Sequence, residues 1–193
     1  LAEGVELDVR GAEPFAARAE VVRDFEEEPI SFLAEGRVQF AGPLGQGSGE
    51  RLQVAGRERV TLDGGPEGPA RFDFDGGTLE AMQVVLDGRE LDARDGTRVR
   101  YEVAGTRYDL SARWARIDRS GELEGEEVKG LVVLDAFGGV VVGVTSDEGW
   151  TAEIVSDTLR VKALESGAPE EISEVEFGEL EAGELLAEGN VRF

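Results

Sequence analysis

The chain has 193 residues, enough for one large β domain, and its apolar content of 40% argues against wholesale disorder. The 42 acidic and 20 basic residues give a net charge of −22, which repels nucleic acid phosphates, so we expect no nucleic acid partner. The sequence has no cysteine and no histidine. This excludes disulfides, thiolate or histidine metal sites and catalysis by a histidine base, and we expect neither a cofactor nor an enzyme.

The first strongly patterned segment is ambiguous between helix and strand. Phe15, Ala19 and Val22 have helical spacing, and residues 16–22 have the length of a short helix. The same residues also fit a strand. Both interpretations stay open for this segment.

The rest of the chain has a dominant period of two. Apolar and polar residues alternate over residues 98–103, 108–114 and 150–154, as expected of strands with one dry and one wet face. Turn signals separate such segments about every ten residues. We predict tight turns at Asp87-Gly88 and Asp95-Gly96, because glycine accepts a positive φ at low cost. The stretch 121–149 contains no motif that indicates a function.

An internal repeat links the two ends of the chain. Residues 32–40 (FLAEGRVQF) match residues 185–193 (LLAEGNVRF) position by position, and residues 1–7 form a weaker third copy. Repeated strand units are typical of stacked or rolled sheets. We therefore interpret residues 1–193 as a single domain that is a fragment, or one unit, of a longer chain.

The repeat resembles the strand signature of the OstA-like family, which includes LptA, LptC and the periplasmic part of LptD. Its A-x-G-N-V pattern is matched by Ala187-Glu188-Gly189-Asn190-Val191, and the V-T-L-x-G pattern by Val60-Thr61-Leu62-Asp63-Gly64. The resemblance covers roughly residues 30–117 and 172–193. The chain departs from it in its strong acidity, which is unexpected for a carrier of an anionic lipid.

The resemblance implies an all-β fold: an open, twisted β-jelly roll, or rolled antiparallel sheet of many short strands. It also implies a non-enzymatic periplasmic or cell-envelope protein that binds or bridges lipid, with lipopolysaccharide or another lipid as partner. Pairing of the end strands would join it to further copies or to related jelly-roll domains. We predict that acyl chains contact the apolar face of the repeat and its neighbours. The candidate groove residues are Phe32, Val38, Phe40, Val84, Val191 and Phe193.

Three other interpretations of the same residues remain. Each candidate groove residue also fits ordinary core packing, because buried apolar residues rarely need a ligand. A β-solenoid serving as a structural or cell-surface scaffold would explain the repeat with a filled core and no groove. A carbohydrate-active jelly roll would require two converging carboxylates beside an aromatic platform, and aromatic residues are only 7% of the chain.

Overall fold

The computed structural model of the protein describes residues 4–9, 15–27, 29–42, 45–56, 59–74, 77–103, 105–119, 122–123, 126–127, 131–165 and 180–192. Within these ranges the protein is all-β, as the alternating pattern predicts, and contains no helix. The segment whose pattern fitted both a helix and a strand forms two strands, β2 and β3. Phe193 lies outside the described residues.

Sixteen strands follow one another along the described chain. The first eight are β1 (Val5–Val9), β2 (Phe15–Ala19), β3 (Val21–Glu27), β4 (Ile30–Gly42), β5 (Gly45–Ala55), β6 (Arg59–Asp63), β7 (Ala70–Phe74) and β8 (Gly77–Ala81). The others are β9 (Gln83–Asp87), β10 (Glu90–Val103), β11 (Thr106–Asp118), β12 (Glu122–Leu123), β13 (Glu126–Glu127), β14 (Leu131–Ser146), β15 (Thr151–Glu165) and β16 (Leu180–Glu188).

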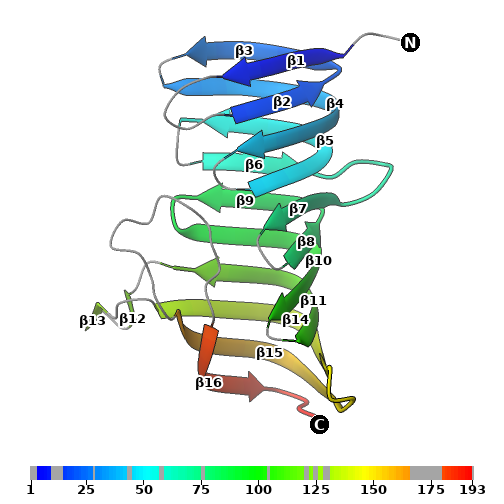
Figure 1. Cartoon of the computed structure of the whole chain (residues 1–193), viewed down its shortest axis with the longest axis vertical. Helices are drawn as coiled ribbons and strands as arrows, with labels where there is room; N and C mark the ends of the chain where they lie inside the picture. The colour runs from blue at the N-terminus through cyan, green and yellow to red at the C-terminus, as the bar shows by residue number, and fades with distance from the viewer. Residues whose placement is uncertain are drawn as a thin grey trace.

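Fourteen of these strands form one antiparallel sheet, and β12 and β13 form a separate ribbon. The main path through the sheet runs β1-β2-β4-β5-β6-β9-β10-β11-β14-β15-β16 and does not return to β1, so the sheet is not a closed barrel. The strands are stacked along the long axis of the molecule, with β1 and β3 at one end and β16 at the other (Figure 1). The rolled antiparallel sheet predicted from the sequence is confirmed.

The long strands belong to two layers at once. The first part of β4 pairs with β3 and its last part with β2, while β10 pairs first with β9 and then with β8. β5 likewise pairs with β7 through its first part and with β6 through its last part. Each long strand therefore crosses from one layer to the other near its middle. The crossings form one long edge of the roll, and the hairpin turns at the strand ends form the opposite edge.

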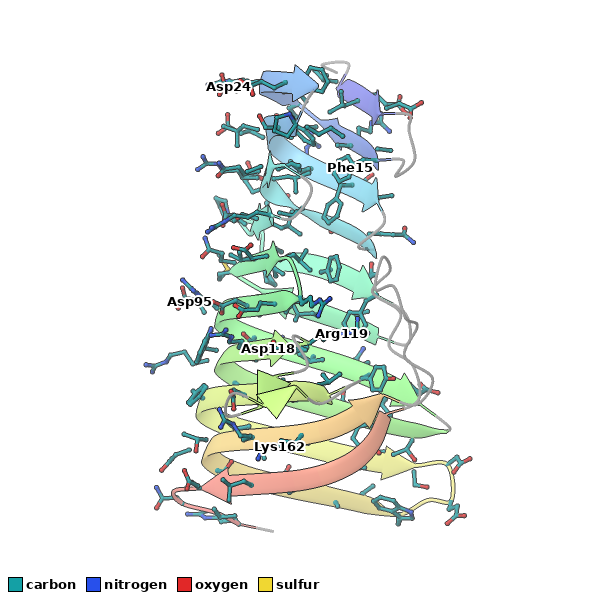
Figure 2. The ribbon with its side chains drawn as sticks, turned by 90° about the vertical axis from the view of Figure 1, so that its left-hand side faces the viewer. Phe15, Asp24, Asp95, Asp118, Arg119 and Lys162 are labelled. Carbon is teal, nitrogen blue, oxygen red and sulfur yellow. The ribbon has the colours of Figure 1, made fainter. Side chains whose placement is uncertain are left out.

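Two-residue bulges make these crossings possible. The pairing of β4 shifts between Glu35 and Val38, where Gly36 and Arg37 have φ values of 80° and 45°. Comparable shifts occur in β10 and β14. The residues with positive φ there are Asp95 and Gly96 in β10, and Gly138 and Gly139 in β14. In Figure 2 the side chain of Asp95 and that of Asp24, a residue of β3 that also has a positive φ, lie on the same side of the roll, away from Phe15.

The bulges explain the repeat found in the sequence. Ala34 and Val38, on either side of the β4 bulge, are 0% and 1% exposed and lie on the same inner face. Gly189 repeats the positive φ of Gly36, at 93°, in the second copy. The prediction of a hairpin turn at Asp95-Gly96 is wrong, because β10 continues through these residues as a bulge. The turn at Asp87-Gly88 is confirmed between β9 and β10.

Candidate functional site

The space between the two layers is the candidate site. Phe32, Val38, Phe40 and Val84 face this interior and are 2%, 1%, 5% and 0% exposed. They belong to one core cluster with residues of both layers. Val191 is half-buried, and Phe193 lies outside the described residues. The fold thus brings the four candidate groove residues of β4 and β9 together, and they pack against other buried side chains.

A ladder of aromatic rings runs across the strands in the N-terminal half of the interior. We call it the aromatic ladder; its members are Phe15, Phe40, Phe72, Phe74 and Tyr101. Successive ring centroids are 5.9 Å apart at the first step and 6.3 Å at each of the next three, all in stacked orientations. Stacking of this kind adds stability beyond area burial. The ladder starts beside β4 and ends on β10.

Glycines on adjacent strands make room for the ladder. A Cβ atom at Gly42 would lie 2.7 Å from the ring of Phe15, and one at Gly77 would lie 2.7 Å from the ring of Phe74. Real Cβ atoms essentially never come so close to another heavy atom. The unusual glycine content therefore serves ring packing as well as turns. The ladder lies close to the hairpin edge, since Phe15 begins β2 and Phe74 ends β7.

Of the ladder residues, only Phe40 was identified as a candidate from the sequence. The signal for the others was present in part, because Phe72 and Phe74 alternate with the polar Arg71 and Asp73. The sequence does not reveal which strands become neighbours. The ladder joins rings from β2, β4, β7 and β10, so it becomes visible only once the pairing is known.

The C-terminal half of the interior is lined by smaller residues. Its buried cluster consists of Leu110, Ala112, Ala115, Ala136, Val140, Val142 and Leu159. No aromatic residue belongs to this cluster, and several apolar side chains packed against it are only half-buried. Those half-buried residues are Val99, Leu134, Val144, Ile154, Val161 and Ala187. Half-buried apolar residues, Phe15 and Phe74 among them, also pack against the N-terminal cluster, but there 20 buried residues stand beside 7 half-buried ones, against 7 beside 6 here. Among the described residues, the C-terminal half of the interior is thus less completely buried.

Thr97 and Ser156 are the most deeply buried hydroxyl residues of the described chain, and they differ in their hydrogen bonding. The Thr97 hydroxyl donates to the carbonyl of Ala93 at 2.9 Å, which satisfies it at the β10 bulge. Ser156 on β15 is 2% exposed, and its Oγ has no hydrogen-bond partner among the described residues. An unpaired buried hydroxyl costs stability, and a polar group of a ligand could satisfy it.

The outer faces carry the charged residues, several of which form ion pairs between adjacent strands. Arg160 donates to both carboxylate oxygens of Asp135, and Asp109 accepts hydrogen bonds from Arg100 and Arg107. Burial raises the pKa of Asp109, but the two arginines outweigh it and hold the pKa below its usual value. Within the described ranges, no cluster of three or more acidic residues could hold a metal ion.

No helix in the described part of the chain has the length and hydropathy needed to span a membrane. Comparison of the chain with models of protein families, with curated proteins and with solved structures found no match.

Proposed function

We propose that the roll binds the acyl part of a lipid between its two layers and serves as a lipid-binding or lipid-bridging component of the cell envelope. The observation that carries this proposal is the gradient of packing along the interior. The half-buried Val144, Ile154 and Val161 line the C-terminal half with apolar surface that remains partly in contact with water. Covering such surface with an acyl chain is favourable, at roughly 25 cal/mol per Å².

The architecture supports entry of a chain from the side. At the edge where the long strands cross between the layers, strand pairing joins the two layers. At the opposite edge, formed by the hairpin turns, no hydrogen-bonded pair of described strands joins them. Separating the hairpin tips would therefore leave every described strand pair intact. The unpaired Oγ of Ser156 offers a hydrogen bond to a polar group at the head of the acyl chain. The resemblance to the OstA-like family points to lipopolysaccharide as one candidate lipid and to a periplasmic location.

The end strands support a second part of the proposal, the pairing of copies or related domains. Among the described residues, β1 pairs only with β2, β3 only with β4, and β16 only with β15. Of the seven large hydrophobic residues that are exposed in the described part of the chain, four lie on these end strands: Val5, Val21, Phe25 and Leu186. Exposed edges with apolar side chains favour strand addition. We expect Phe25→Glu to shift a sedimentation-velocity distribution toward the monomer, and an unchanged distribution would argue against pairing at β3.

Native mass spectrometry after lipid extraction and re-addition of lipopolysaccharide or phospholipid tests the lipid site. Ile154 and Val155 are adjacent, half-buried residues that face opposite sides of β15. We expect Ile154→Asn to abolish lipid adducts and Val155→Asn, the matched control, to retain them. Circular dichroism of both variants establishes that the sheet is intact. Adducts that persist equally in both variants would place the lipid elsewhere.

A scaffold with a filled core is the second candidate function. The burial of the N-terminal half favours it, since Phe72 is 0% exposed and Leu52 and Leu62 are 0% and 1% exposed. A protein that forms no adduct with any lipid class, while folding normally, would support the scaffold function.

A further inference from the structure

One of the two layers contains β7, β8 and the last part of β10, and its outer face has a hollow of about 360 Å³ that the proposed lipid site does not use. It extends over β7, β8, β10, β11, β14 and β15. Apart from Val99 and Leu110, which pack in the interior, its lining residues point away from the interior, because they alternate with the buried residues of the same strands. Arg98, for example, precedes the inward-facing Val99 and follows the buried Thr97. The hollow and the apolar interior are therefore on opposite faces of one layer.

A missing side chain helps to form the hollow. Gly143 on β14 stands in the outward row between Asp109 on β11 and Glu153 on β15. A Cβ added at Gly143 would have its nearest heavy atom, the carbonyl oxygen of Asp109, 3.9 Å away. Backbone strain therefore does not require glycine at this position, and a side chain could be accommodated. Its absence leaves the surface of the sheet open between two rows of charged residues.

The hollow has a local charge unlike that of the whole protein. It is lined by three arginines (Arg71, Arg98, Arg100) and three acidic residues (Glu80, Asp109, Glu153), whereas the chain carries −22. At an ionic strength of about 0.1–0.15 M, salt screens the repulsion from the remaining acidic surface beyond about 8–10 Å. An anion that is repelled by most of this protein can thus approach this hollow.

Two guanidinium groups in the hollow retain free donors. Arg98 has no hydrogen bond or ion pair with another described residue, although Glu80 is its cross-strand neighbour. Arg100 donates to Asp109 through Nε at 3.0 Å, and no bond of its terminal nitrogens to the described residues is present. The hydroxyl residues Ser111 and Thr78 pair across the strands with Arg98 and Arg100. These groups form a set of donors on one surface.

We propose that this outer hollow binds a phosphate-type oxyanion, with Arg98 as its principal ligand and Arg100, Ser111 and Thr78 as further donors. Guanidinium groups match the geometry of phosphate oxygens, and hydrogen bonds to a charged group are about twice as strong as neutral ones. Asp109 keeps Arg100 in position and, because its pKa is lowered, remains ionised. The phosphate can belong to a free anion or to the head group of a lipid.

Titration of the protein with inorganic phosphate, against chloride at equal ionic strength, tests this site by NMR. We expect saturable shifts of the Arg98, Ser111 and Gly143 signals. Arg98→Gln should weaken binding by about tenfold or more, because it removes a charge-assisted hydrogen bond. Gly143→Val should abolish binding by filling the hollow. Arg51→Gln is the matched control, since Arg51 is also exposed and has no bond to a described residue. It should leave the affinity unchanged.

A second titration with dihexanoyl phosphatidic acid distinguishes the two sources of phosphate. Equal affinity for both probes would identify the phosphate group alone as the ligand. Tighter binding of the lipid, with additional shifts at Ile154 on the inner face, would identify a lipid head group. Shifts that do not saturate, or that are the same in Arg98→Gln, would overturn the proposal. Because only outer-face signals report on the hollow, its failure can be told apart from failure of the interior lipid site.

Discussion

Replacing the glycine of the β4 bulge by alanine tests the role of the bulges in joining the two layers. Gly36 has φ of 80°, and an added Cβ would lie 2.8 Å from both Cβ and Cγ of Glu20. The left-handed conformation costs a non-glycine residue about 1–2 kcal/mol. Moving Glu20 away from the added Cβ costs about 1–3 kcal/mol more. We expect Gly36→Ala to lower the free energy of unfolding by about 2–5 kcal/mol.

Gly96 provides the matched control. It has φ of 89° in the β10 bulge, but an added Cβ would meet no heavy atom within 4 Å. Gly96→Ala should therefore cost only the backbone term of about 1–2 kcal/mol. Urea unfolding followed by circular dichroism measures the free energy of unfolding of both variants. In thermal unfolding, a loss of 1 kcal/mol lowers the Tm of a chain of this size by roughly 2–4 °C. Equal destabilisation by the two substitutions, or a neutral Gly96→Ala, would refute the assignment of separate backbone and packing costs.

Three further predictions concern single side chains. Ser156→Ala should leave the free energy of unfolding unchanged or raise it by about 1 kcal/mol in urea titrations, because it removes an unpaired buried hydroxyl; a clear loss would mean that the hydroxyl is hydrogen-bonded. Asp109→Asn should destabilise the protein above the usual aspartate pKa of about 3.9. Since its pKa is lowered in the folded state, this difference should vanish as pH falls through the folded-state pKa, and a difference that grows in acid would contradict the ion-pair assignment. Phe72→Ala should cost about 3–5 kcal/mol in the same urea assay, because the ring is fully buried in the aromatic ladder; a cost below about 1 kcal/mol would mean that the site collapses to fill the cavity.

Alternation in the sequence was sufficient to predict the fold class and the two faces of most strands. Arg98 and Arg100 face outward and Val99 inward, as period two requires. The repeat correctly grouped Phe32, Ala34, Val38 and Phe40 on one face. It did so because the two-residue bulge at Gly36 and Arg37 keeps the alternation in step on both sides.

The crossing of strands between layers could not be predicted from local sequence. Asp95-Gly96 has the composition of a hairpin turn, yet β10 continues because β9 pairs with it before these residues and β8 after them. Long-range pairing therefore decided the outcome. The aromatic ladder and the outer hollow have the same origin, since each combines residues from strands that are distant in the sequence. Local patterns show which way a side chain points, but not which strands become its neighbours.

The most direct test of lipid binding between the layers uses a stearic acid that carries a nitroxide on its acyl chain. Methyl NMR signals of valine report on both faces of the sheet, with Val144 and Val161 on the inner face and Val85 and Val155 on the outer face. If the acyl chain enters the interior, the nitroxide should broaden the signals of Val144 and Val161 more strongly than those of Val85 and Val155. Equal broadening on both faces, or none at saturating lipid, would contradict the proposed function.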